Sequence, residues 1–255
     1  MSASAFHRHD VALLRAPNPG PFTLSGTNTW VVGRDPAWII DPGPADDEHL
    51  AAVAAEAARR GGAGGIALTH GHADHTAGVA ALAELAGSPP VAAANWDGAT
   101  VKLSDGTAFG PLVAIATPGH ATDHLAFLAG GAAFTGDAVL GEGSVFITPD
   151  PGALAGYLAA LARLRALPLE AIYPGHGPPV ADPAAKLDEY VAHRLGREER
   201  LVDALARGLR AHRDLLDDAW SDAPAALRPA ATLTLHAHID KLADEGRLPA
   251  DVPRR

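Results

Sequence analysis

The chain has 255 residues, enough to bury a full core as one large domain or as a large and a small domain. It contains no cysteine, which excludes disulfides and thiolate metal sites, and its formal net charge of −10 argues against nonspecific nucleic-acid binding through a basic surface. No segment approaches the roughly 18 apolar residues of a membrane span and no secretory leader is evident, so we expect a cytoplasmic protein without membrane partners.

The first part of the chain predicts strands alternating with helices. Residues 22–43 predict two strands joined by a turn at residues 33–36, because β-branched and aromatic residues suit a sheet, whereas Gly, Asp and Pro suit a turn. Residues 45–62 predict a helix with acids in its first turn, arginines in its last turn and a Gly-Gly stop. A strand at 65–69 and a helix at 76–87 follow.

The same alternation continues to residue 176. Residues 90–94 and 107–120 are expected to be extended, and residues 124–137 predict a hairpin with a Gly-Gly turn. A helix at 151–167 and an extended segment at 170–176 complete the series. Paired strands with interposed helices indicate a layered α/β protein.

From residue 181 onward the sequence predicts a small helical domain, which divides the chain into residues 1–180 and 181–255. A long helix is expected within 182–208, followed by short helices at 212–220, 225–232 and 233–248. This pattern resembles a helix-turn-helix unit, but its last helix offers Lys241 among several acids. We therefore expect a packing or oligomerisation module, no binding to duplex DNA, and leave homodimerisation open.

Polar side chains follow five apolar segments, at turns that contain Gly or Pro. These turns carry Asp41, residues 70–75, His120, Asp137 and His176. Loops at the ends of rigid strands are where sheet proteins hold functional groups. We therefore expect the five turns to converge on one cleft.

The densest of these turns is "HGHADH", residues 70–75. Alternate residues of an extended segment face the same way, so His70 and His72 could hold one metal while Asp74 and His75 hold another. His124 either supports the loop after His120 or touches substrate. The remaining histidines are expected to be solvated or locally hydrogen-bonded; they are His7, His9, His49, His193, His212, His236 and His238.

Four segments, "THGHADH", "TPGHATDH", "FTGD" and "YPGHG", resemble the successive metal-binding motifs of the metallo-β-lactamase superfamily, in order, over residues 26–179. The resemblance implies a four-layered αββα sandwich with a dinuclear site at one edge. It assigns His70, His72 and His120 to the first metal. It assigns Asp74, His75 and His176 to the second metal, Asp137 as a bridge, and Asp41 as a support behind the ligands.

The sequence departs from the true lactamases of this superfamily, which place a cysteine or another residue where this chain has aspartates. An antibiotic-degrading role is therefore not expected. "SGTNTWVVG", "TPGHATDHLAF" and "KLDEYVAHRLGREERLVDAL" look most similar to the branch that includes beta-lactamase-like protein 2, a single-strand endoribonuclease. In that branch a winged-helix-like domain follows the sandwich.

The implied chemistry is hydrolysis by a metal-bridging hydroxide. Metal binding would lower the pKa of the water that forms it from 15.7 toward about 7. Zinc fits the nitrogen and oxygen donors, with manganese or iron as alternatives. Asp137 would bridge the metals, and Asp74 or a metal-bound water would handle the leaving-group proton.

The substrate stays open at this stage. One candidate is single-stranded RNA, and another is a thioester or small ester, as in the glyoxalase-II-like branch. The alternative of another class is a non-catalytic sensor whose metal site only binds a ligand. Five residues are candidates for the rim of the site, with packing as the competing explanation; they are Trp30, His124, Ser144, Phe146 and Tyr157.

Overall fold

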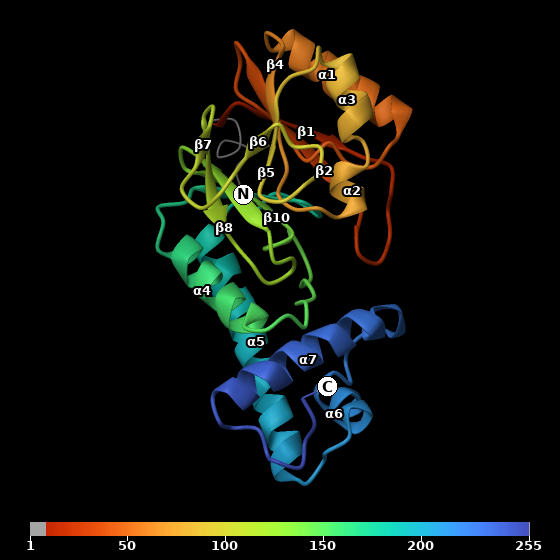
Figure 1. The fold of residues 1–255 in the computed structure, drawn as a ribbon, viewed down its shortest axis with the longest axis vertical. Coiled ribbons are helices and arrows are strands. Elements are labelled where there is room, and N and C mark those ends of the chain that lie inside the picture. Colours follow the sequence, from red (N-terminus) through yellow and green to blue (C-terminus); the bar gives the residue numbers. More distant parts are fainter. Residues whose placement is uncertain (1–8, 255) are drawn as a thin grey trace.

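Two β-sheets pack face to face in the computed structural model, which describes residues 9–254 (Figure 1). The first sheet has the order β1 (Val11–Arg15), β2 (Asn28–Val32), β3 (Ala37–Ile40), β4 (Ala63–Ala67), β5 (Val91–Ala93) and β6 (Val101–Lys102). The second has the order β11 (Ala171–Pro174), β10 (Ala132–Gly136), β9 (Leu125–Ala129), β8 (Leu112–Ala116) and β7 (Ala108–Phe109).

Strand β2 illustrates why the central strands are apolar throughout. Trp30 and Val32 face the core between the sheets, whereas Val31 faces the helices on the outer side. Strand β10 repeats this pattern, because Phe134 lies between the sheets and Ala133 lies under helices. Strands that are buried on both faces need apolar residues at consecutive positions.

Helices cover the outer face of each sheet. Helices α1 (Asp47–Arg59) and α3 (Val79–Leu85) cover the first sheet, and α4 (Ala153–Arg165) covers the second. The side chain of Asp46 caps α1 by accepting a hydrogen bond from the backbone N–H of His49. The predicted αββα sandwich is thereby confirmed.

The tail is helical, as predicted, and extends below the sandwich in Figure 1. It comprises α5 (Pro183–Ala206), α6 (His212–Ala219), a 3₁₀ turn η2 (Ala225–Leu227) and α7 (Arg228–Asp244). The described residues 181–254 contain no strand, so no β-hairpin wing lies among them. Leu187, Tyr190 and Ala237 share one core with α4, and the division at residue 180 stays a prediction.

The sequence prediction is wrong at four places. The first is the single helical turn α2 (Ala73–Thr76), which lies partly within the turn expected at residues 70–75. The separate short helices expected at 225–232 and 233–248 are instead the 3₁₀ turn η2 followed by one helix, α7. Its proline lies in the first turn, where the missing N–H needs no partner. Strands β1 and β6 were not expected, because β1 is a partly exposed edge strand and β6 has only two residues. In the described part of the chain, no helix combines the length and apolarity needed to cross a bilayer.

Candidate metal centre

The chain brings five strand ends to one edge of the sandwich. Strands β3 and β4 are parallel. Strands β8 and β10 both run antiparallel to β9, and β11 is parallel to β10. The residues that follow these strands therefore meet, and all of the predicted ligands come together there: His70, His72, Asp74, His75, His120, Asp137 and His176. Their role as ligands stays a prediction.

One cluster consists of three imidazoles. Ligand-capable atoms of His70, His72 and His120 all lie within 4.8 Å of one another. Nε2 of His120 is 3.0 Å from Nδ1 of His72. Nε2 of His70 is buried and has no hydrogen-bond partner among the described residues. Because buried polar atoms are normally paired, an unpaired imidazole nitrogen in this position fits a metal ligand.

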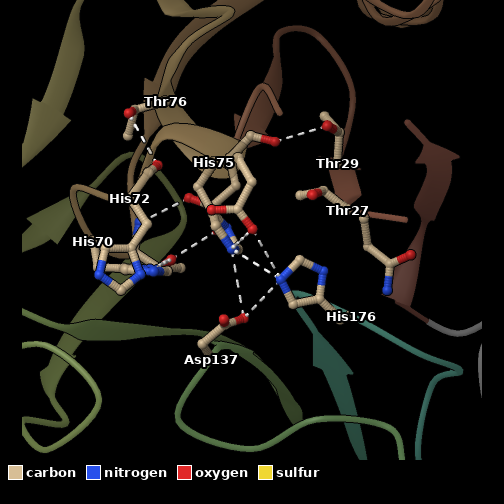
Figure 2. A network of polar contacts seen from close by, with 12 residues as sticks. Thr27, Thr29, His70, His72, His75, Thr76, Asp137 and His176 are labelled. Carbon is tan, nitrogen blue, oxygen red and sulfur yellow. Dashed lines mark hydrogen bonds and ion pairs between the residues drawn. The ribbon is translucent and has the colours of Figure 1, made fainter. Parts of the chain in front are cut away.

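The second cluster contains Asp74, His75 and His176, and Figure 2 shows its two histidines facing Asp137. Nε2 of His176 is 3.3 Å from Nε2 of His75 and 3.2 Å from Oδ2 of Asp74. Oδ1 of Asp137 lies 3.5 Å from His75 Nε2 and 3.4 Å from His176 Nε2. Oδ2 of the same carboxylate lies 3.6 Å from Nε2 of His120. Asp137 thus turns one oxygen toward each cluster.

Asp41 contacts these groups from behind, and its role as their support stays a prediction. Its Oδ1 accepts the backbone N–H of Thr69 at 2.8 Å, and its Oδ2 accepts the Thr69 hydroxyl at 2.7 Å. Nδ1 of His75 lies 2.9 Å from the same Oδ2. Donation from Nδ1 to the carboxylate leaves Nε2 of His75 directed into the site. Thr69, whose hydroxyl also lies 3.0 Å from His70 Nδ1, was not predicted.

Backbone carbonyls orient two further imidazoles in the same way. Nδ1 of His120 is 3.4 Å from the carbonyl oxygen of Phe146. Nδ1 of His176 is 3.4 Å from the carbonyl oxygen of Gly26. In both rings Nε2 is left to face the site.

His124 supports the site and does not enter it. Its Nδ1 is 2.8 Å from the Thr117 hydroxyl, and its Nε2 accepts the backbone N–H of Asp137 at 3.1 Å. Burial lowers the pKa of His124 to about 3, so the ring is neutral and can accept this hydrogen bond. Both nitrogens are therefore occupied, and the ring fixes the loop that carries Asp137.

The two clusters differ in how readily they bind protons. Burial lowers the pKa of His120 to about 4, so this imidazole is neutral and ready to bind metal. Burial opposes protonation of His176 as well, but the nearby carboxylates, above all Asp137, outweigh it and raise the pKa of His176 to about 9. A cation entering the second cluster must therefore displace a proton.

Two glycines allow the backbone to approach the site closely. A Cβ at Gly175 would lie 2.6 Å from Oδ1 of Asp137, and a Cβ at Gly136 would lie 2.5 Å from the Thr69 hydroxyl. Gly136 also has a φ of +46°, which a larger residue adopts at a cost. Any side chain at these two positions would displace the groups that form the site.

A cleft of about 340 Å³ opens from the site, with His120 and Asp137 in its wall. Of the predicted rim residues, Ser144 and Phe146 line it. The others are packing or supporting residues, because Trp30 and Tyr157 are buried in the two cores and donate hydrogen bonds to backbone carbonyls, and His124 holds Asp137.

The cleft also contains residues that were not predicted as functional. The loop before β2 contributes Phe22, and the tail contributes His193 and Trp220. The expectation that His238 is solvated or locally hydrogen-bonded is wrong, because the ring is fully buried, its Nδ1 lies 3.9 Å from the distant Glu198 carboxylate, and neither nitrogen has a hydrogen-bond partner among the described residues. His193 is partly exposed and lines the cleft, although its Nδ1 is buried. His7 lies outside the described residues.

Comparison with known proteins gives a family and several relatives. A sequence profile described as the metallo-beta-lactamase superfamily matches residues 22–112 and 96–176. A "Beta-lactamase-like protein 2 homolog" from Caenorhabditis elegans is 31% identical, over 90% of this chain and 82% of that protein. An "Atrochrysone carboxyl ACP thioesterase" from Aspergillus fumigatus is 33% identical, over 93% of this chain and 74% of that protein.

Solved structures agree with the sequence comparison. A metallo-beta-lactamase family protein from Thermus thermophilus superposes with a TM-score of 0.76 at 23% identity, covering 93% of this chain and 94% of that chain. A protein solved in a di-iron-bound form has a TM-score of 0.53 at 28% identity, covering 67% of this chain and 95% of that chain. The chain belongs to the metallo-β-lactamase superfamily, whose members are mostly hydrolases.

Proposed function

We propose that this chain is a dinuclear metal-dependent hydrolase that cleaves an ester or thioester with an apolar acyl group. The observation that carries the proposal is the position of Asp137. One of its carboxylate oxygens faces the cluster of three imidazoles, and the other faces the cluster of two imidazoles and a carboxylate. Nitrogen and oxygen donors suit zinc, with manganese or iron as alternatives. The relative solved in a di-iron-bound form supports a site for two metals.

Bound metals would supply a hydroxide at neutral pH and stabilise the negative oxygen that develops on the attacked carbonyl. The protein's own residues prepare this chemistry. Asp41 fixes the ring of His75, and His124 fixes the loop of Asp137. Asp74 is 31% exposed, against 10% for Asp137, so Asp74 is the carboxylate placed to exchange a proton with a leaving group or with solvent.

The cleft favours an apolar substrate over a polyanion. Arg197 binds Asp222 at 2.5 Å, and Arg194 donates to the carbonyl of Val145 but keeps a buried Nε without a hydrogen-bond partner among the described residues. Three acids, Asp137, Glu142 and Asp222, line the same cleft, so its two arginines do not make it basic. Phe22, Phe146 and other apolar residues form much of the remaining wall. The similarity to a protein named as a thioesterase supports the same class of substrate.

Cleavage of single-stranded RNA is the second candidate. It is favoured by the similarity to a beta-lactamase-like protein 2 homologue over 90% of this chain, together with the endoribonuclease activity that the resemblance to this branch implies. A non-catalytic ligand sensor is the remaining alternative. It would be indicated by a single metal ion held by four protein ligands, with no position open for water.

Elemental analysis of the purified chain, combined with assays of a benzoyl thioester and a fluorescent single-stranded RNA on the same sample, tests the proposal. We expect two metals per chain and hydrolysis of the thioester. The double variant His72→Ala, His75→Ala should lose metal from both clusters and all turnover, whereas Leu195→Ala, on an exposed position of α5, should match the parent. RNA cleavage without thioester hydrolysis would establish the second candidate, and full turnover by the double variant would rule out the metal mechanism.

A further inference from the structure

Phe146 contacts two of the three imidazoles in the cluster of His70, His72 and His120. Its ring centroid lies 4.5 Å from that of His120 and 6.3 Å from that of His72. Its backbone carbonyl oxygen accepts a hydrogen bond from Nδ1 of His120 at 3.4 Å, which leaves Nε2 of His120 facing the site. The position of Phe146 therefore decides how His120 is oriented.

The helical tail holds the backbone on both sides of Phe146. Before it, the carbonyl of Val145 accepts a hydrogen bond from Nη2 of Arg194 on α5. After it, the backbone N–H of Ile147 donates to the hydroxyl oxygen of Thr234 on α7 at 3.1 Å. Two helices that follow the sandwich in the chain thus set the course of the backbone next to a predicted metal ligand.

The other end of this segment is attached beside His120 itself. The backbone N–H and the hydroxyl of Thr148 both donate to the carbonyl oxygen of Gly119, at 2.9 and 3.1 Å respectively. Gly119 directly precedes His120 in the chain. Residues 145–148 therefore connect the tail to the loop that carries His120, and a shift at the tail end of this segment would reach the imidazole.

The contact made by Thr234 depends on its hydroxyl group. The side chain is buried, and the hydroxyl donates to the carbonyl of Ala230, one turn earlier in α7, at 3.1 Å. The oxygen keeps its lone pairs to accept the N–H of Ile147. Because Ile147 is fully buried, water could not replace this acceptor. The cost of an unpaired N–H would favour a displaced backbone, which would carry the Phe146 carbonyl away from His120.

We propose that Thr234 is a positioning residue of the metal centre, which acts through residues 145–148 to hold the Phe146 carbonyl against His120. This inference rests on the proposed dinuclear metal site and extends the support of its ligands from the sandwich to the tail. Metal binding and the packing of α7 are then coupled.

Thr234→Val tests this assignment, because valine keeps the size and branching of threonine but cannot accept a hydrogen bond. Competition between the full chain and a chromogenic chelator gives the affinity for each zinc ion. We expect one of the two zinc ions to bind about 10-fold more weakly, as is typical when a group that orients a metal ligand is lost. Thr234→Ser, which keeps the hydroxyl, should restore most of the affinity.

NMR of the imidazole protons identifies which ligand has changed. In the zinc-loaded full chain, the Nδ1–H proton of His120 should exchange with water about 10-fold faster in Thr234→Val than in the parent, because its hydrogen bond to Phe146 opens more often. The Nδ1–H proton of His176, which donates to the carbonyl of Gly26, should exchange as in the parent. A purely structural role for Thr234 would leave both protons unchanged.

Thr232→Val is the matched control. The Thr232 hydroxyl donates to the carbonyl of Arg228 at 3.0 Å, which is the same intrahelical bond that Thr234 makes, but Thr232 does not line the cleft. This variant should match the parent in zinc affinity and in exchange of the His120 proton. Equal losses in Thr232→Val, or no recovery in Thr234→Ser, would overturn the inference.

Urea unfolding of the same variants separates stability from metal binding. Lower stability of Thr234→Val with parent-like zinc affinities and proton exchange would overturn the inference, and Thr234→Ala gives the same comparison if the valine variant does not fold. A parent chain that binds no zinc would refute the proposed function together with this inference. Two bound zinc ions and the expected differences, without thioester hydrolysis, would support the role of Thr234 and refute the proposed reaction.

Discussion

Asp41 connects a strained backbone to the orientation of a predicted ligand. It is 1% exposed, has a φ of 52°, and accepts hydrogen bonds from both Thr69 and His75. Asparagine has nearly the same shape and tolerates a positive φ, but its NH₂ group would face one of these donors. We expect Asp41→Asn to weaken metal binding about 10- to 100-fold, because His75 loses the acceptor that fixes its ring.

Competition with a chromogenic chelator measures this change directly. Asp203→Asn, at an exposed aspartate in the second half of α5, should leave the affinity unchanged. Parent-like metal affinity in Asp41→Asn would mean that His75 is oriented by other contacts.

The sequence predicts the candidate ligands better than the residues around them. The residues from His70 to His75 are close in sequence, and their spacing alone indicates a metal site. Thr69, Phe22 and Thr234 carry no such signal, because their importance arises from partners that only the tertiary fold brings near. Trp30 and Tyr157 show the converse error, since aromatic residues beside functional loops can simply complete the core.

At the scale of elements, strands buried on both faces and well-capped helices are predictable from sequence, and most were found where expected. Strand β1 was missed because its mixed exposure gives no clear periodicity. The predicted division between residues 232 and 233 is wrong, because neither glycine nor proline lies at that point and helix α7 continues through it. The proline of α7 lies in the first turn, where it is compatible with a continuous helix.

An ion-pair network joins α5 to α7 and the segment that follows. The buried carboxylate of Glu198 lies 3.9 Å from Nδ1 of His238, 2.8 Å from Nζ of Lys241 and 2.6 Å from Nη1 of Arg247. His238, Lys241 and Arg247 together hold the pKa of Glu198 well below its usual range. A depressed carboxylate pKa stabilises the fold above the unfolded-state value of 4.5, and this contribution is lost as the pH falls below it.

We expect Glu198→Gln to lower the free energy of unfolding by about 1–3 kcal/mol at pH 7, and by clearly less at pH 3.5. Urea unfolding at the two pH values measures the difference. Glu199→Gln, at the exposed neighbouring position, serves as the control and should change little at either pH. An equal loss at both pH values would show that the charge of Glu198 does not stabilise the tail.

At the scale of the whole molecule, the tail contributes both to the main core and to the cleft. Leu187 and Tyr190 of α5 pack in one core with α4 and strand β11, while the far half of α5 packs in a separate core with α6 and α7. The hydroxyl of Tyr190 also accepts the backbone N–H of Leu140, in the loop that follows Asp137. Movement of the tail would therefore disturb the loop that carries the bridging carboxylate.

This arrangement leads to a prediction for native-state hydrogen exchange. Amides of α4 and of residues 187–194 should exchange with the same opening free energy, because unfolding either segment exposes the core they share. Amides of α6 and of α7 after Ile239 should open at lower free energy, since they pack mainly in the separate core of the tail. If all of α5 opened together with α6 and α7, independently of α4, the chain would divide near residue 180 as its sequence predicts. The cleft would then lie between two units that can separate, and substrate access would depend on their relative motion.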